Sequence, residues 1–290
     1  MKKIILPVLV ALPLLVTAQR HHEIGLTAGA SSFYGDLQPN ILPDNNKMFQ
    51  PTVGLLYKYF VSPRLGFRFG ANYIRLTAAD SLSLNKTYEK RNLSFSNNVG
   101  EIYGAIEFNF LAVDQYRFKV SPYIFAGVGA FYSNPFAYDE KGEKQVLRDL
   151  STEGQGIAQY PDRKAYPLIN AAFPIGGGVK FFIGKTIMLA AEVNMRYTST
   201  DYIDDVSRSY VNLDTLRAYK GTKAVDMSYR GNQSGKWDGN YPNYKFQRGD
   251  FKGNDWYWTA GITATVYFDA FGNAKKYLQS RCPKVFGRGR

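Results

Sequence analysis

Few residues in this chain carry side chains that could act as catalytic bases, nucleophiles or transition-metal ligands. The only histidines are the adjacent His21 and His22, and the only cysteine is Cys282. Nucleophilic or acid–base catalysis needs a base and its partner within hydrogen-bond reach. Zinc and iron–sulfur sites need several Cys or His ligands. We therefore expect no enzyme activity, no metal site and no cofactor.

Three short motifs invite a more specific chemistry, but each has a simpler interpretation. The acidic pairs Asp139-Glu140 and Asp204-Asp205 do not fit the spacing of a 12-residue calcium loop, so we expect solvated loop charges. The run Gly176-Gly177-Gly178 lies inside a strand pattern with no helix after it, which favours close packing over phosphate binding. The cell-adhesion tripeptide Arg248-Gly249-Asp250 is more readily a chance occurrence.

The elements that must position these residues are long strands. Apolar and polar residues alternate with a period of two in eight segments, which indicates strands with one apolar face. Each is longer than the usual five or six residues of a globular strand. The predicted strands are 23–34, 52–61, 65–73, 101–110, 118–132, 171–183, 187–197 and 256–268.

The polar face of these strands carries all their charges. The acids are Glu23, Glu101, Glu107 and Glu192, and the bases are Lys58, Arg68, Lys119, Lys180 and Arg196. A barrel in lipid is apolar outside and polar inside, and opposite charges can neutralise one another in its lumen. Outward aromatics near the strand ends suit interface girdles. We predict an all-β fold: an eight-stranded antiparallel transmembrane β-barrel. The alternative is a soluble β-sandwich with its charged face in water.

The connections alternate in length. Short turns are predicted near residues 62–63, 113–116 and 184–185, and long polar loops at 35–49, 78–98, 133–168 and 198–255. Outer-membrane barrels have short periplasmic turns and long extracellular loops. The barrel is therefore expected over residues 19–269, with both of its ends on the periplasmic side. Pro122 and Pro174, which lack an N–H, lie inside predicted strands and could shift a boundary.

The segment before the barrel has the layout of a signal peptide. Lys2 and Lys3 precede an apolar run from Ile4 to Val16, which ends in small residues. About 13 apolar residues are too few for a transmembrane helix, although a retained anchor is the alternative. We expect residues 1–18 to be removed, so that the formal charge of +12 falls by two to +10. The protein is then expected in the outer membrane of a Gram-negative bacterium.

The segment after the barrel, residues 270–290, is a basic tail. An unpaired cysteine in an exported protein suggests a free thiol or an intermolecular disulfide. We expect the tail to bind a periplasmic partner, with Cys282 forming a disulfide to it; the alternative is an inert thiol on a disordered tail. The candidate partner-binding residues are Lys275, Lys276, Arg281, Cys282, Lys284, Arg288 and Arg290.

The first strand carries a family resemblance. Glu23-Ile24-Gly25-Leu26, followed by Gly29-Ala30-Ser31-Ser32-Phe33-Tyr34-Gly35-Asp36-Leu37, resembles the start of PorG-like proteins. These are outer-membrane barrel components of the type IX protein secretion system of Bacteroidota. The resemblance is sharpest over residues 23–40 and rests on general layout beyond them.

The resemblance implies a non-enzymatic role. PorG-like proteins associate with a periplasmic ring that contains a lipoprotein, and they are required for export of cargo with a C-terminal sorting domain. The basic tail with Cys282 would then contact the ring lipoprotein. We expect outer-membrane lipid and this ring as partners, and no nucleic acid. The alternatives are a stand-alone envelope-stabilising or surface-binding OmpA-like barrel and, less favoured, a small-solute channel.

Overall fold

The computed structural model describes residues 21–111, 120–183, 186–235 and 240–268. Eight long antiparallel strands form a closed barrel, and every strand is paired with its neighbours in the chain or, for the first and last, with each other. The barrel strands are β1 (His21–Tyr34), β2 (Gln50–Phe60), β3 (Leu65–Ala79), β4 (Ser94–Asn109), β5 (Val120–Tyr132), β8 (Ile169–Ile183), β9 (Ile187–Thr198) and β10 (Trp256–Phe268). The predicted fold class is confirmed.

Side chains of the barrel sort by face as the alternation predicts. Outward residues such as Ile24, Leu26 and Ile102 are 54%, 62% and 66% exposed, whereas the inward Lys58 and Arg68 are each only 1% exposed. An apolar exterior around a charged interior is the reverse of a soluble sandwich, and closure leaves no unpaired strand edge. The barrel is therefore built to lie in a lipid bilayer. Among the described residues, no helix has the length and apolarity to cross a membrane.

Two strands extend well beyond the bounds that the sequence predicts. β3 continues to Ala79, and β4 begins at Ser94, within the segment expected to be a loop. The outward positions of this extension are polar and include Arg75, Ser96 and Asn98. A charged residue on the outer face is costly in lipid, so the β3–β4 hairpin rises beyond the bilayer. The predicted loop boundary at 78–98 was wrong because period-two alternation marks only the lipid-facing part of a strand.

The two prolines are accommodated within the predicted strands. The β5–β8 ladder runs from Ala126 opposite Ile175 to Gly129 opposite Ala172 and skips the pairs between them. Pro174 lies at this interruption, where its missing N–H removes a ladder hydrogen bond. Pro122 pairs opposite Val179 near the start of β5. β8 begins at Ile169, two residues before its predicted start, and the predicted start of β5 at residue 118 lies outside the described residues.

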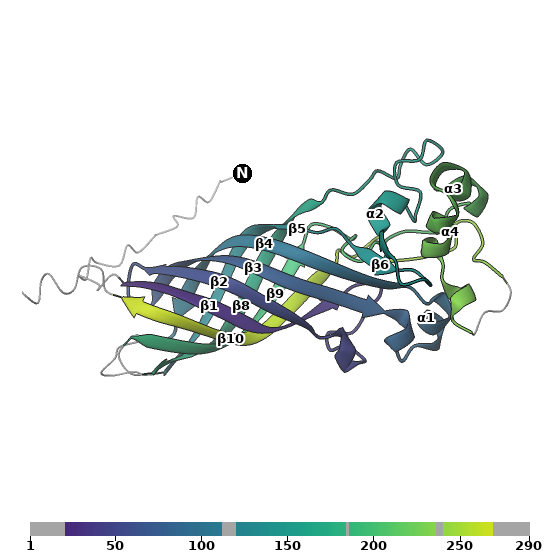
Figure 1. Cartoon of the computed structure of the whole chain (residues 1–290). Coiled ribbons are helices and arrows are strands. Elements are labelled where there is room, and N and C mark those ends of the chain that lie inside the picture. Colours follow the sequence, from purple (N-terminus) through teal and green to yellow (C-terminus); the bar gives the residue numbers. More distant parts are fainter. Residues whose placement is uncertain (1–20, 112–119, 184–185, 236–239, 269–290) are drawn as a thin grey trace, which may run out of the picture.

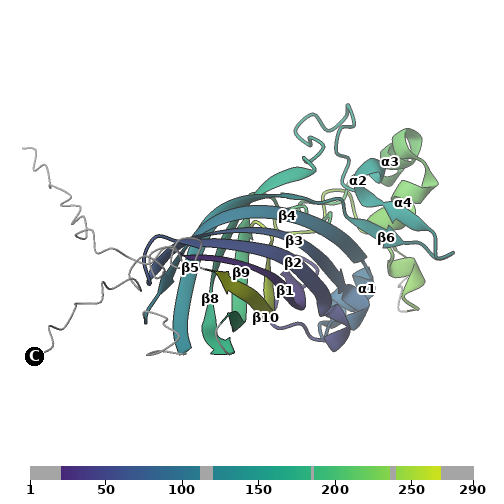
Figure 2. The same cartoon turned by 60° about the vertical axis from the view of Figure 1, so that its left-hand side comes forward.

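The long connections fold into a compact layer at one end of the barrel, here called the outer cap (residues 35–49, 80–93, 133–168 and 199–255 of the described chain). Figures 1 and 2 show its helices grouped beyond the same end of the strands. It contains β6 (Phe136–Tyr138), β7 (Lys144–Val146), α1 (Lys86–Arg91), α2 (Leu147–Leu150), α3 (Leu213–Lys220), α4 (Thr222–Ser228) and the 3-10 helices η1 (Asn46–Met48), η2 (Asp80–Leu82) and η3 (Gly231–Gln233).

The outer cap shares a hydrophobic core with the mouth of the barrel. Phe33, Ile74, Phe95 and Phe131 from the strands pack with cap residues, among which Ile203 is fully buried. A second cluster, which includes Leu216 and Val225, holds α3 and α4 to the rest of the cap. The apolar core therefore closes the outer mouth of the barrel.

Candidate functional site

The eight predicted interior charges lie together in the lumen, and they are here called the lumen charge cluster. Four are glutamates and four are lysines or arginines, so the described lumen is neutral in sum. None is more than 9% exposed. The ninth predicted charge, Lys119, lies outside the described residues. The cluster consists of Glu23, Lys58, Arg68, Glu101, Glu107, Lys180, Glu192 and Arg196.

Glu107 on β4 is the centre of this cluster. Its carboxylate lies 2.6 Å from Lys180 Nζ, 2.9 Å from Lys58 Nζ and 3.4 Å from Arg68 Nη1. Arg68 also donates to Glu192 at 3.0 Å. Three strands thus supply cations to one carboxylate. Such charges are retained in an interior of low dielectric constant only when each has partners of opposite sign.

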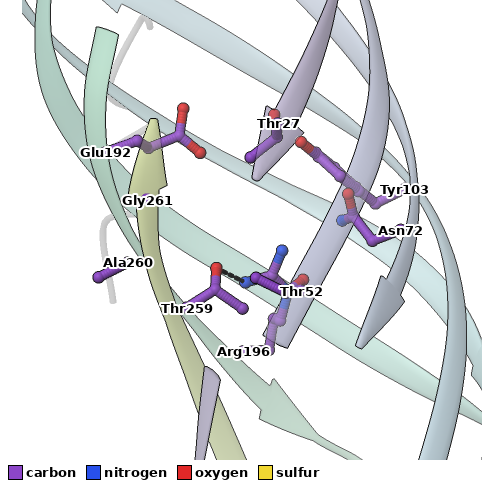
Figure 3. Close-up of a pocket in the computed structure, with 9 residues that line it drawn as sticks. All are labelled: Thr27, Thr52, Asn72, Tyr103, Glu192, Arg196, Thr259, Ala260 and Gly261. Carbon is purple, nitrogen blue, oxygen red and sulfur yellow. Dashed lines mark hydrogen bonds between the residues drawn. The ribbon is translucent and has the colours of Figure 1, made fainter. Parts of the chain in front are cut away.

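A second group of charges lies nearer the outer cap. Arg196 Nε donates to Glu101 Oε2 at 2.8 Å, and the Tyr257 hydroxyl donates to the same oxygen at 2.7 Å. Asn72 Nδ2 donates to Glu101 Oε1 at 2.7 Å. Figure 3 shows the hydrogen bond that Arg196 donates to Thr259, with Glu192, Asn72 and other inward side chains around the same cavity.

Very little free space remains between these side chains. The cavity in Figure 3, lined by Thr27, Glu192 and Arg196 among others, measures about 10 Å³, roughly the room that one water molecule needs. Interior glycines make space for rings as well as charges: a Cβ on Gly70 would lie 2.2 Å from the ring of Tyr103. Gly178 packs against the backbone of β9 in the same way, which agrees with the packing interpretation of residues 176–178.

Aromatic rings close the other end of the lumen. His21 stacks on Phe60 with ring centroids 4.5 Å apart and contacts Tyr267 at 4.6 Å. Its Nε2 atom lies 3.3 Å from Glu23 Oε1. A buried imidazole in an aromatic layer has a structural role and no access to an external substrate. The lumen is therefore blocked by aromatic rings at the end opposite the outer cap, by ion pairs in the middle and by the apolar core at the outer cap.

The outer cap contains buried charges that the sequence analysis missed. Asp204 and Asp205 were expected to be solvated, but they are 1% and 0% exposed, so that expectation was wrong. Tertiary contacts reverse it: Asp204 accepts the N–H groups of Leu37 and Val206, and Asp205 accepts hydrogen bonds from Thr152 and Tyr166. The hydrogen bonds of each carboxylate therefore hold one segment of the outer cap against another.

Arg248 is the main cation of this layer. It lies 3.1 Å from Glu153 and 3.8 Å from Asp205, and it is 3% exposed. It also donates to the carbonyl oxygens of Ser228 and Asp205. A receptor would need this guanidinium on the surface, so its burial excludes a cell-adhesion role for Arg248-Gly249-Asp250. The only sequence signal for these contacts is the unusual number of charges in long aromatic-rich loops.

Several cap carboxyls have raised pKa values. Burial is the largest cause for each. It raises the pKa of Asp201 to about 8 and that of Asp36 to about 6, and it raises the pKa of Asp204 and Asp255 well above the usual range. Neighbouring carboxylates add to the effect, because like charges disfavour ionisation. Among the described residues, no group of three or more acidic, His or Cys side chains could hold a metal ion.

The candidate partner residues of the tail lie outside the described residues. The last described residue, Phe268, is at the end of β10 where His22 of β1 pairs with it. This end of the barrel is opposite the outer cap (Figure 1). The structure therefore brings together all eight residues predicted for the lumen and does not test the seven predicted for the tail.

Solved structures similar to this chain include those of three bacterial proteins, all with TM-scores below 0.4. They are the outer membrane protein OprG of Pseudomonas aeruginosa (8% identity, 87% of this chain and 97% of that one, TM-score 0.37), Neisserial surface protein A (9%, 87% and 98%, 0.39) and Ail, the attachment invasion locus protein of Yersinia pestis (8%, 86% and 99%, 0.39).

No curated protein has a significant match to the sequence. A family model, by contrast, matches residues 2–222, which is most of the chain. The matched part runs from before β1 through α3 and so includes seven of the eight barrel strands. The chain belongs to the family described as a domain of unknown function, DUF6089.

Proposed function

We propose that this protein is a non-enzymatic outer-membrane barrel that anchors or positions the periplasmic ring of the type IX protein secretion machinery. The observation that carries the proposal is the filled lumen: three layers of side chains cross it, and the cavity that Glu192 and Arg196 line measures about 10 Å³. Such a barrel cannot conduct a polypeptide, so a role in secretion must be one of attachment. The opening motif from Glu23 to Leu37 supports the link to this machinery.

The periplasmic contact is assigned to residues 270–290. Six of these residues are lysine or arginine and none is acidic, so the tail suits an acidic protein surface. β1 begins and β10 ends at the short-turn end of the barrel, which is periplasmic in outer-membrane barrels. A thiol in the oxidising periplasm can form a disulfide with a partner. We assign Cys282 that role toward the ring lipoprotein.

Affinity purification from solubilised membranes tests this assignment. The full chain should retain the ring components, and a chain truncated after residue 269 should lose them while keeping its barrel. On non-reducing gels, Cys282→Ser should remove a band of higher mass. Lys141→Gln, on an exposed turn of the outer cap, is a matched control and should retain the ring. Normal secretion in a strain lacking the protein would rule the proposal out.

A stand-alone surface-binding barrel is the second candidate, because the outer cap is folded and contains open cavities. A solute channel is disfavoured by the filled lumen. Purified protein in planar lipid bilayers should give no stepwise conductance. Steady channel openings would contradict the filled lumen and favour the channel alternative.

A further inference from the structure

Two adjoining recesses open on the surface of the outer cap. The first, here called the tyrosine recess, has a volume of about 620 Å³ and is lined by four tyrosines and one phenylalanine. The second, the cationic recess, measures about 570 Å³. Gln247, Gly249 and Asp250 line both recesses, so they share a wall. Each volume lies in the range of pockets that bind small molecules.

The tyrosine recess combines ring faces with hydrogen-bonding groups. Tyr88, Tyr210, Tyr229, Tyr241 and Phe246 supply the rings. The side-chain amides of Asn240, Asn243 and Gln247 lie in the same lining. Amides both donate and accept hydrogen bonds. Ring faces beside amides match a ligand with apolar C–H faces and many hydroxyl groups, which is the chemistry of a sugar ring.

Tyr210 is the most informative residue of this recess. It is 2% exposed and lines the tyrosine recess. A tyrosine hydroxyl can donate a hydrogen bond to a ligand that enters such a recess. Its ring is held edge-on to that of Tyr229, with centroids 6.0 Å apart. The hydroxyl is thus a fixed donor at the wall of an open cavity.

The cationic recess supplies charge. It is lined by Arg163, Arg208, Lys245 and Lys252, with Asp250 as its single acid. Arg163 is held in place by bonds to the Glu153 and Ser209 carbonyl oxygens, at 2.8 and 2.7 Å. The guanidinium of Arg208 forms an ion pair with the exposed Asp162, at 3.3 Å. Four cations against the two acids Asp250 and Asp162 leave an excess positive charge that favours an anionic ligand.

We propose that these recesses form one binding site for an acidic saccharide, with sugar rings in the tyrosine recess and carboxylate, sulfate or phosphate groups in the cationic recess. A single-stranded nucleic acid also uses rings and cations, but its sites place them along one continuous groove. Here the rings of the tyrosine recess share it with Lys90, Arg91 and Arg248, and four more cations line a second recess across a shared wall, so the site consists of two recesses and not of one groove. The site lies on the end of the barrel opposite the proposed ring contact, so it is independent of the secretion proposal.

Binding of short oligosaccharides to the purified full chain in detergent tests this site. The probes are a galacturonate oligomer, a sulfated heparin fragment and a phosphorylated mannose oligomer. The methyl ester of the galacturonate oligomer is the uncharged control. At least one acidic probe should bind saturably and more weakly as salt rises, and the methyl ester should bind at least ten-fold more weakly. No saturable binding to any acidic probe would overturn the proposal.

Two variants separate the recesses. Arg208→Gln with Lys252→Gln should weaken acidic probes about ten-fold and change the methyl ester little. Tyr210→Phe removes only the hydroxyl and should weaken the acidic and esterified sugars alike, about five-fold. Lys47→Gln with Lys141→Gln removes two exposed cap cations outside the site and should change neither. Equal weakening by that control, or tighter binding of oligothymidylate than of any sugar, would refute the saccharide assignment.

Discussion

Glu107→Gln is the sharpest test of the lumen charge cluster. The substitution keeps the shape of the side chain but removes the charge that Lys180, Lys58 and Arg68 share. Lys58 keeps Glu23 at 3.8 Å, and Arg68 keeps Glu192 at 3.0 Å. Lys180 has no other carboxylate within ion-pair distance among the described residues. The variant therefore leaves one ammonium group buried without a counter-charge.

The expected loss in the free energy of unfolding follows from general measurements on buried ion pairs. Removing one partner of such a pair destabilises a protein by about 3–5 kcal/mol. With a urea dependence of about 2 kcal/mol per molar, a loss of about 4 kcal/mol lowers the unfolding midpoint by about 2 M. The midpoint is measured by tryptophan fluorescence of the barrel in lipid vesicles. Glu143→Gln, on an exposed turn of the outer cap, should leave the midpoint unchanged.

A second substitution shows whether charge is the cause. Glu107→Gln with Lys180→Met removes the stranded ammonium and restores a neutral lumen, so it should recover at least half of the lost midpoint. Replacing a buried pair by apolar groups of similar volume is often neutral or stabilising. A Glu107→Gln midpoint within about 0.5 M of the original would refute the lumen argument. Failure of the double variant to recover would show that shape, not charge, matters there.

Three further outcomes are expected. Because the raised pKa of Asp201, about 8, lets the folded cap keep a proton that the unfolded chain releases above about pH 4, the cap should lose stability as pH rises from 5 to 8. Between pH 5 and 8, hydrogen exchange in residues 199–211 should then accelerate by more than the intrinsic pH dependence of amide exchange predicts. A smaller acceleration would contradict this. Arg248→Met strands two buried carboxylates and should make the cap sensitive to protease at a cost of about 3 kcal/mol, while the barrel stays folded; Arg217→Met, at an exposed pair, is the control, and equal sensitivity of the two would count against it. Gly178→Ala places a Cβ 2.2 Å from a β9 carbonyl oxygen and should reduce the yield of folded barrel on gels, whereas Gly100→Ala meets nothing within 4 Å and should not; equal yields would disprove the packing argument.

The barrel could be predicted from the sequence because each lipid-facing strand carries its own signal. In β2 and β3, residues alternate between lipid and lumen, and a one-residue shift would place Lys58 or Arg68 in lipid. Because that shift is costly, the sequence of each strand specifies which of its faces lies against lipid. The eight lumen charges were identified for the same reason.

The outer cap could not be predicted, because its signals are not periodic. Asp204, Asp205 and Arg248 lie in long polar loops, and their burial depends on distant partners: Glu153 is 95 residues from Arg248, and Leu37 is 167 residues from Asp204. The extension of β3 and β4 beyond the bilayer was missed because no lipid boundary marks it. The position of Tyr210 in the wall of the tyrosine recess follows from loop packing alone.

The sequence by itself determined which side of each strand faces lipid, because burial of apolar surface and the cost of charge in hydrocarbon act on every residue locally. Only the tertiary structure decided which charges pair across the lumen, how the long loops close its mouth and where two recesses form on the outer cap. Those features depend on side chains that meet from distant parts of the chain.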